Sequence, residues 1–265
     1  MKDQILALLP GDFPWKEQFY YFDTVGSTNT LAKAMADEGA PHGTVLIADR
    51  QTAGRGRRGR SFLSPPGMGI YMSVILRPQA APAQLMHLTC AAACAMCDAV
   101  EQAAHFRPGI KWTNDLVYGE KKLAGILTEL SFHSQGQSAY AVIGIGVNCC
   151  QREKDFAPEI REMAGSLSMA AGKPIDRCAV AAAMAEALWR MDARLLSDRK
   201  GILQQYRKDC ITIGRDVSVV RSDSVRHGHA FGVDDEGALL VRFPDGHTEA
   251  VNSGEVSVRG MYGYL

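Results

Sequence analysis

The hydrophobic pattern of this chain changes its period at about residue 211, and this change constrains the fold more than any other feature. Before that point, apolar residues recur at helical spacing over 84–102 and 174–196. Beyond it, only short alternating strands occur, separated by Asp-Glu-Gly and Pro-Asp-Gly turns. These strands are expected at 217–220, 230–233, 238–243 and 256–258. We therefore predict an α+β protein in two parts, 1–211 and a small β-barrel at 212–265.

The first part is expected to contain a mostly meander-like sheet, with its helices segregated from the strands. Its strand-like runs are 44–48, 69–76, 110–112, 116–118, 123–130 and 140–147. A short helix should begin after Ser27, whose hydroxyl can cap the first free backbone N–H groups. A shorter helix should end near Cys210. No low-complexity linker occurs at the junction, so the two parts are expected to pack together.

Charge and composition exclude several classes of protein. The chain has 265 residues and a net charge of zero, from 29 Lys and Arg against 29 Asp and Glu. It therefore has no overall positive field to hold nucleic acid or an anionic membrane. The apolar run within the first ten residues is too short to span a membrane. Seven scattered cysteines favour reduced thiols, and we predict a cytoplasmic protein.

A basic glycine-rich segment lies between two expected strands: Gly54-Arg55-Gly56-Arg57-Arg58-Gly59-Arg60-Ser61. It contains the dinucleotide pattern G-x-G-x-x-G and nearly matches a P-loop, but both motifs require a helix directly afterwards. Two prolines and a strand follow instead, which argues against both. An RGG-like nucleic-acid tract is also weakly supported, because the segment is a single copy without interleaved aromatic residues.

The chemistry of this segment favours an anionic ligand. A solvated surface loop is the alternative for an arbitrary run of charges. Here, however, glycines let backbone N–H groups approach an anion, and guanidinium groups offer paired hydrogen bonds to phosphate or carboxylate. We expect the loop to close over a charged ligand.

A second cluster of polar residues follows at a strand end, in Lys111-Trp112-Thr113-Asn114-Asp115, and Lys122 comes seven residues later. Two lysines beside a carboxylate that can bind Mg²⁺ suit a triphosphate and the charge that develops at its α-phosphorus. Surface salt bridges are the alternative for either lysine taken alone. The sequence thus favours an enzyme that uses ATP to activate a small carboxylic acid as an adenylate.

Five segments, in the same order and at similar separations, resemble the biotin protein ligase family (biotin–[acetyl-CoA-carboxylase] ligase). They are Ser27-Thr28-Asn29, 51–60, 111–115, 122–127 and 143–148. The resemblance implies a catalytic domain like those of biotin ligases and class II aminoacyl-tRNA synthetases, with a mixed sheet, packed helices and an SH3-like C-terminal barrel. It also implies a two-step reaction: biotin and MgATP form biotinyl-5′-AMP, and a lysine of a biotin carboxyl carrier domain then takes the biotin.

The resemblance also implies roles for individual residues. The catalytic set is Lys122, Arg57 and Lys111. The biotin-binding set is Ser27, Thr28, Asn29, Gln51, Gly54, Arg55, Gly56, Arg57, Lys122 and Gly125. The ATP-binding set is Arg58, Arg60, Phe62, Lys111, Asn114, Asp115 and Asn148, with Asp115 also as a ligand of Mg²⁺.

The sequence departs from the family pattern at two positions. Thr113 stands where the family usually has proline, and Phe62 stands where tryptophan often follows the loop. Some members also carry an N-terminal DNA-binding helix-turn-helix, whereas 26 residues precede Ser27 here. We therefore expect a ligase that does not bind DNA or a membrane, and a homodimer is compatible with the resemblance.

Two metal-like patterns are interpreted as structural. Cys90, Cys94 and Cys97 have the spacing of a C-x₃-C-x₂-C iron–sulfur motif, but they share one face of an Ala-rich helix and are expected in the core. His227 and His229 alternate on an expected strand without a third ligand nearby in sequence, which favours a solvated face.

Two other functions are alternatives to biotin ligation for this sequence. A lipoate ligase or octanoyltransferase would share the fold and the acyl chemistry. A nucleic-acid-binding module would use the arginine loop and show a steep dependence of its affinity on salt.

Overall fold

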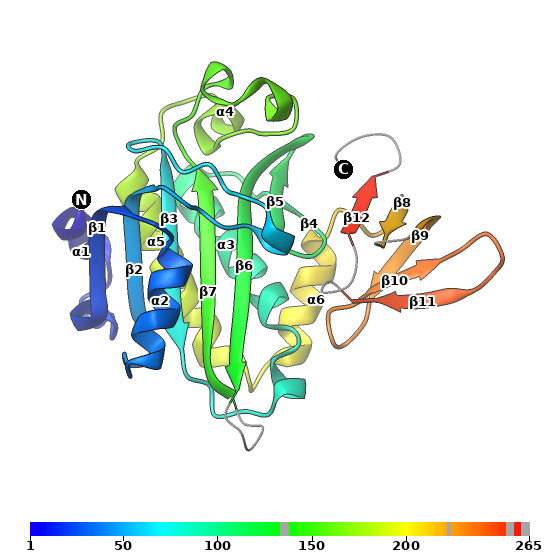
Figure 1. Cartoon of the computed structure of the whole chain (residues 1–265), viewed down its shortest axis with the longest axis horizontal. Coiled ribbons are helices and arrows are strands. Elements are labelled where there is room, and N and C mark those ends of the chain that lie inside the picture. The colour runs from blue at the N-terminus through cyan, green and yellow to red at the C-terminus, as the bar shows by residue number, and fades with distance from the viewer. Residues whose placement is uncertain (133–137, 222–223, 253–256, 261–265) are drawn as a thin grey trace.

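Two sheets organise the chain in the computed structural model, which describes residues 1–132, 138–221, 224–252 and 257–260. Within these residues, a seven-stranded sheet has the order β1-β2-β3-β7-β6-β5-β4, and a five-stranded sheet has the order β11-β10-β9-β8-β12. Figure 1 shows the large sheet at the centre and the small sheet beside it. The fold is therefore a mixed α+β sheet domain with a small antiparallel sheet after it, as the sequence predicted.

The bounds of the elements are as follows. The strands of the large sheet are β1 (Phe19–Val25), β2 (Thr44–Gln51), β3 (Gly69–Leu76), β4 (Gly109–Lys111), β5 (Asp115–Tyr118), β6 (Lys121–Phe132) and β7 (Ser138–Asn148). The α-helices are α1 (Lys2–Leu8), α2 (Thr28–Asp37), α3 (Leu88–Ala104), α4 (Leu167–Ala171), α5 (Arg177–Arg194) and α6 (Arg199–Asp209). Short 3₁₀ turns are η1 (Lys16–Gln18), η2 (Arg57–Gly59), η3 (Pro82–Leu85), η4 (Glu153–Asp155) and η5 (Pro158–Ile160). The strands of the small sheet are β8 (Arg215–Val220), β9 (Val225–Val233), β10 (Leu239–Arg242), β11 (Thr248–Val251) and β12 (Ser257–Gly260).

The large sheet is mixed because of its first strand. Strand β1 pairs with β2 in parallel, whereas the other neighbours in the sheet pair antiparallel. Strands β4 to β7 form the predicted meander, and β3 pairs with β7 at the edge of this meander. Strands β1 and β11 and helices α1 and α4 were not predicted from the sequence. The predicted strand at 256–258 begins outside the described residues, and β12 covers Ser257–Gly260.

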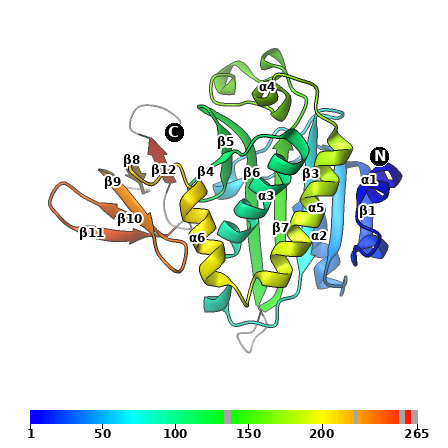
Figure 2. The ribbon, with the colours of Figure 1, turned by 180° about the vertical axis from the view of Figure 1, so that it is seen from behind.

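The two faces of the large sheet have different partners. On β7, Ile143 and Ile145 belong to the main hydrophobic core with residues of α3 and α5, while the intervening Gly144 lies on the opposite face. Helices α3 and α5 cover the core face, as the view from behind shows (Figure 2). Helix α2 covers part of the opposite face through Ala32 and Ala36. The rest of that face is left for a cavity.

The long apolar helix is part of the core. The stretch Pro82–Ala104 is long and apolar enough to cross a membrane, but 72% of its most apolar window is buried inside the fold. Cys90, Cys94 and Cys97 lie within it and are buried, as predicted. Across the described residues, no group of three or more His, Cys, Asp or Glu is placed to hold a metal ion. His227 and His229 are exposed and bond to Ser218 and Asp216, respectively.

The small sheet packs against the large domain. Val217, Val219 and Leu239 belong to the same hydrophobic core as the large sheet. Arg207 on α6 donates to the carbonyl of Val233 at 2.7 Å. The two parts therefore form a continuous core, as expected from the absence of a flexible linker.

Candidate functional site

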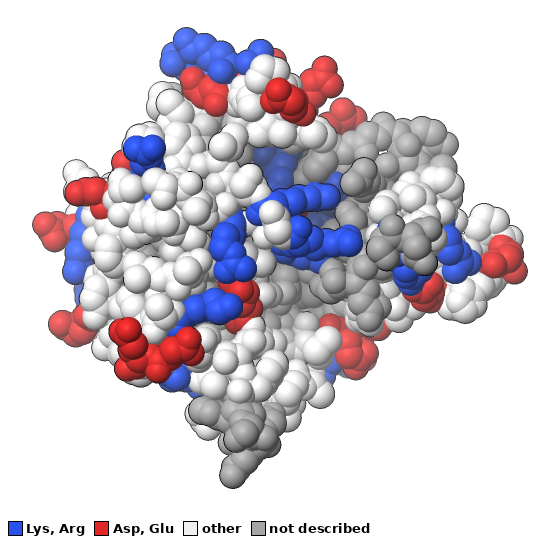
Figure 3. All heavy atoms as spheres, viewed as in Figure 1, with Lys and Arg blue, Asp and Glu red and all other residues white. Residues whose placement is uncertain are grey.

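A cavity of about 690 Å³ opens on the face of the large sheet that carries α2. Lys and Arg side chains gather around a hollow in the middle of this face (Figure 3). The cavity is lined from the start of α2, the basic loop, the β4–β5 turn and the middle of β6 and β7. These segments are far apart in sequence, and they include nearly all the residues that the sequence analysis singled out.

Glycines form the floor of this cavity. Gly125 on β6 is paired in register with Gly146 on β7, and Gly144 follows on the same face. An ideal Cβ at Gly146 would lie 2.6 Å from the Phe62 ring, so only a residue without a side chain lets Phe62 lie there. The Ile-Gly-Ile-Gly pattern of β7 thus serves both faces, with isoleucines in the core and glycines under the cavity.

One end of the cavity presents neutral hydrogen-bonding groups. Ser27 caps α2, because its hydroxyl accepts a bond from the Thr30 amide, and Thr28 and Asn29 follow in the first turn. The Gln51 Oε1 atom accepts bonds from the backbone amide and the hydroxyl of Thr28, at 2.9 and 3.1 Å. All four side chains line the cavity. This network fixes the orientation of the Gln51 amide, since its Nε2 group also donates to the loop residue Ser64.

A fully buried hydroxyl stands behind these groups. Ser73 on β3 lies 2.8 Å from the Thr28 hydroxyl and 2.6 Å from Asn29 Oδ1. The Asn29 Nδ2 group donates to the carbonyl of Leu127 and to Glu129. Both the oxygen and the nitrogen of the Asn29 side-chain amide are therefore held by hydrogen bonds within the protein. Ser73 was not identified from the sequence, because a lone serine in an apolar strand gives no signal of its own.

The basic loop is an ordered, irregular hairpin rather than an open coil. Its two legs are joined by backbone bonds from Gln51 to Ser64, from Phe62 to Gly54 and from Gly56 to Arg60, at 3.1, 2.9 and 2.7 Å. Only the single turn η2 interrupts it, with Arg58 at φ 55°. The loop therefore connects β2 to β3 without a following α-helix. This confirms the prediction that it is neither a Rossmann dinucleotide motif nor a P-loop.

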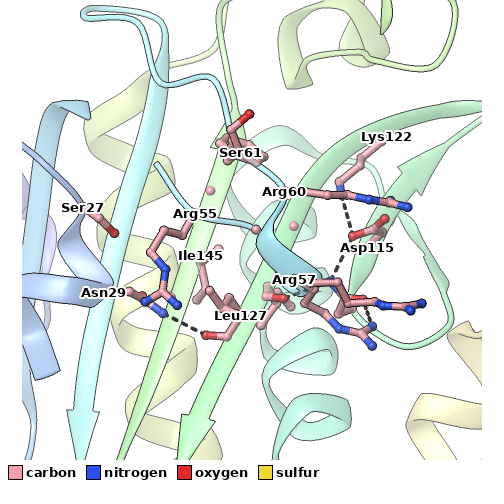
Figure 4. Close-up of a pocket in the computed structure, with 18 of the residues that line it drawn as sticks. Ser27, Asn29, Arg55, Arg57, Arg60, Ser61, Asp115, Lys122, Leu127 and Ile145 are labelled. Carbon is pink, nitrogen blue, oxygen red and sulfur yellow. Dashed lines mark hydrogen bonds and ion pairs between the residues drawn. The ribbon is translucent and has the colours of Figure 1, made fainter. Parts of the chain in front are cut away.

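The opposite end of the cavity is charged. Lys122 Nζ lies 2.6 Å from Asp115 Oδ1, and Arg57 donates to Asn114 Oδ1 at 2.6 Å. Burial lowers the pKa of the Arg57 guanidinium, and the nearby charge of Asp115 acts in the opposite direction. In Figure 4, Ser27 and Asn29 lie on one side of the cavity, and Arg57, Arg60, Asp115 and Lys122 lie on the other, with Arg55 between them. The site thus has a neutral end and a cationic end.

The β4–β5 turn supplies part of the cationic end. Lys111 and Asp115 are paired in register at the ends of the two strands, and both line the cavity. Between them, the Trp112–Thr113 peptide bond is cis. The Trp112 Nε1 atom donates to the carbonyl of Gly237 at 3.0 Å, so this turn also contacts the small sheet. Thr113, where proline was expected, is buried, and its carbonyl accepts a bond from Tyr206.

Most predicted site residues line the cavity, but two do not. Gly54 lies in the N-terminal leg of the loop, where a Cβ would come 2.3 Å from the carbonyl oxygen of Phe62. Asn148 is buried at the end of β7; its Nδ2 group donates to the carbonyl of Gly165, and its Oδ1 atom accepts a bond from Gln151. Residues that line the cavity but had no predicted role are Ser61, Trp112, Ile126, Leu127, Gly144, Ile145, Gly146, Glu162 and Met163.

Two protein-family models match the chain. Residues 21–148 match the biotin/lipoate A/B protein ligase family, and residues 212–259 match the biotin protein ligase C-terminal domain. The first match covers the basic loop, both ends of the cavity and the glycine strands. The second covers most of the small sheet.

Curated relatives and solved structures match over most of their lengths. The bifunctional ligase/repressor BirA of Bacillus subtilis is 36% identical over 87% of this chain and 71% of its own length. The biotin–[acetyl-CoA-carboxylase] ligase of Mycobacterium tuberculosis is 33% identical over 97% of this chain and 93% of its own. The biotin protein ligase of Aquifex aeolicus, solved with biotin and ATP, superimposes with a TM-score of 0.77 at 28% identity, covering 91% of this chain and 98% of that one.

Proposed function

The chain belongs to the biotin protein ligase family, and from that premise we propose that it makes biotinyl-5′-AMP from biotin and ATP and transfers the biotin to a carrier-domain lysine. The observation that carries this proposal is the division of one cavity into a neutral hydrogen-bonding end and a cationic end. A biotin molecule has a cyclic urea at one end and a carboxylate at the other. The urea suits the neutral end of the cavity, and the carboxylate suits the cationic end.

The neutral end suits the urea of biotin. A buried cyclic urea needs donors for its carbonyl oxygen and acceptors for its two N–H groups. Ser27, Thr28, Asn29 and Gln51 supply hydroxyl and amide groups around one spot. Ser73 and Ser64 orient the last three of these side chains, and the Thr30 amide holds the Ser27 hydroxyl. A lipoate ring offers no such hydrogen bonds, so this polar lining favours biotin over lipoate.

The cationic end suits the reacting carboxylate and the phosphates. Lys122 stands where it can donate to oxygens that gain charge during attack on the α-phosphorus. Arg57, Arg58 and Arg60 reach the same space from the loop, and Lys111 reaches it from the β4–β5 turn. Preorganised cations of this kind stabilise the transition state more than the ground state, which is the requirement for catalysis. Gly125 leaves room for the Lys122 side chain.

The aromatic ring of Phe62 provides an apolar surface above Gly146. We propose that this ring covers the adenine of ATP. The family often has tryptophan at the position of Phe62. Asn148 would contact the adenine by exchanging its bonds to Gly165 and Gln151 when the nucleotide binds.

The residues present fit a magnesium ion carried in by ATP. Mg²⁺ is commonly held by one or two carboxylates together with substrate phosphates and water. The Asp115 carboxylate lines the cavity beside Lys122 and Asn114, which matches a single protein ligand. When bound, the ion would neutralise phosphate charge. Lys122 and Asn114 would then hold the Asp115 carboxylate in place through their bonds to Oδ1.

The acceptor is proposed to be the biotin carboxyl carrier domain of acetyl-CoA carboxylase or a related enzyme. A boundary between a catalytic domain and a C-terminal domain near residue 211, a cytoplasmic location and the absence of DNA binding stay predictions. Native mass spectrometry would decide whether the protein is a homodimer, and a salt titration with duplex DNA would reveal any phosphate-driven affinity.

The decisive experiment is mass spectrometry of a carrier domain incubated with the protein, biotin and MgATP. We expect one biotin to be added to one lysine, and no addition when ATP or biotin is omitted. Isotope exchange between pyrophosphate and ATP should depend on biotin and not on lipoate. Exchange that depends on lipoate alone would overturn the proposed substrate.

A further inference from the structure

Glu129 is a carboxylate beside the cavity that has no part in the proposed reaction. It lies on β6, on the same strand face as Gly125 and Leu127. Its side chain is only 19% exposed. A largely buried carboxylate costs free energy unless its oxygens are paired, so its partners indicate what it holds in place.

Three side chains converge on the Glu129 carboxylate. Lys33 Nζ on α2 lies at 3.0 Å, Asn29 Nδ2 at 3.1 Å and Arg55 Nη1 of the basic loop at 3.3 Å. Burial by itself would raise the pKa of Glu129, but the hydrogen bonds from Lys33 and Asn29 and the charge of Arg55 hold it below its usual value. The carboxylate is therefore ionised at neutral pH and can bind a cation from the loop.

The loop is held on both sides of the cavity by arginines two residues apart. Arg57 bonds to Asn114 on the β4–β5 turn, whereas Arg55 bonds to Glu129 on β6. Figure 4 shows Arg55 extending from the loop toward Asn29, away from the cationic end. The same carboxylate thus contacts both the loop and a residue of the neutral end.

We propose that Glu129 is a positioning residue that holds the basic loop closed over the neutral end of the cavity through Arg55 while it orients the Asn29 amide. The consequence for biotin rests on the proposed function, but the contact with the loop does not. Closure of a loop restricts the escape of a bound intermediate and completes a binding site. A residue that favours the closed loop before ligand binds also reduces the ordering cost of binding.

The four arginines of the loop make closure measurable with trypsin, because cleavage requires local opening of the chain. The test variant is Glu129→Gln, which keeps a carbonyl acceptor for Asn29 but removes the charge that binds Arg55. Without ligand, the rate of cleavage after Arg58 and Arg60, read by mass spectrometry, should rise about two- to fivefold, which is within the range expected for a partly exposed ion pair. An unchanged rate would overturn the proposal.

Lys33→Met is the matched control. It removes another cation from the same carboxylate, but Lys33 lies on α2 and is not part of the loop, so cleavage there should stay close to the wild-type rate. Circular dichroism and thermal unfolding of both variants would show whether the fold is retained. If Lys33→Met opened the loop as much as Glu129→Gln, the effect would belong to α2 or the strand and not to a specific hold on Arg55.

A double-mutant cycle tests the route. In an Arg55→Gln background, adding Glu129→Gln should leave the rate of cleavage after Arg58 and Arg60 unchanged, because the pair is already broken. A further increase of the same size would overturn the role of Arg55.

Biotin binding provides a second test. Glu129→Gln should raise the Kd for biotin about threefold and leave the KM for ATP near wild type. A wild-type protein that binds no biotin would overturn the proposed function while leaving the protease result intact.

Discussion

The missing side chain of Gly144 makes room for Asn29. An ideal Cβ at position 144 would lie 1.8 Å from Asn29 Oδ1 and 2.4 Å from its Cγ atom, closer than any real contact. The Asn29 amide cannot turn aside easily, because Ser73, Leu127 and Glu129 all bond to it. The neutral end of the cavity therefore depends on a glycine in a neighbouring strand.

Replacing Gly144 by alanine should weaken biotin binding. The added methyl group must displace Asn29, and overpacking of this kind typically costs about 1 to 3 kcal/mol. We expect the Kd for biotin, measured by calorimetry, to rise roughly ten- to a hundredfold. Gly11→Ala is the control, because a Cβ at Gly11 meets nothing within 4 Å. Unchanged biotin affinity in Gly144→Ala would show that Asn29 does not contribute to the binding site.

Lys122→Ala should slow formation of the adenylate more than it weakens biotin binding. The Lys122 ammonium stands at the cationic end beside Asp115, and its hydrogen bond to reacting oxygens would strengthen as charge develops. We expect biotin-dependent pyrophosphate exchange to fall about 10²- to 10³-fold, the loss typical of one stabilising donor. The neighbouring Lys121 donates to the carbonyl of Arg161, so Lys121→Ala is the matched control. Equal losses in rate and in biotin affinity would contradict this role.

Much of the fold could be predicted because the local signals agreed with the tertiary structure. The Ser27 cap begins α2 as expected, and the run 69–76 is strand β3. Strand β1 was missed because its buried and exposed residues do not alternate, and because its pairing with β2 depends on residues far along the chain. Strand β11 was missed because it is short and largely exposed.

The cavity itself could be predicted only in part. Loop arginines, Lys111, Asp115 and Lys122 could be found because unusual residues were concentrated in short segments. Ser73 and Glu129 could not: Ser73 is a lone serine in an apolar strand, Glu129 stands in an ordinary amphipathic stretch of β6, and the role of each depends on what packs opposite. Asn148 was assigned to the ATP-binding set through the resemblance, but its bonds to Gly165 and Gln151 appear only in the folded chain.

The reactivity of the cysteines should follow their burial. Burial raises the pKa of Cys90 to about 12 and also raises that of Cys94, Cys97 and Cys149, so few thiolates exist at pH 8. Of the seven thiols, only the partly buried Cys150 and Cys178 should be accessible to a maleimide in the native protein, and the raised pKa of Cys178 should slow its reaction. All seven should react after unfolding in guanidinium chloride. Rapid native labelling of Cys94 would show that α3 is not packed in the core.

Replacing Arg57 by glycine should loosen the cationic end of the loop. It removes the 2.6 Å bond to Asn114, which ties the loop to the β4–β5 turn. Since the loop both contacts and covers the intermediate, biotinyl-5′-AMP should leave the protein about tenfold faster, or biotin should bind more weakly. Release into solution can be followed by chromatography after a single turnover without carrier domain.

Arg57→Lys separates the two properties of this side chain. It keeps a positive charge but loses the planar fork that can hold two acceptors at once, so it should restore retention of the adenylate only in part. If glycine at position 57 left both the biotin affinity and the retention unchanged, the loop would not belong to the site. If lysine restored full retention, charge alone would be sufficient, and the bond to Asn114 would not be what holds this end of the loop closed.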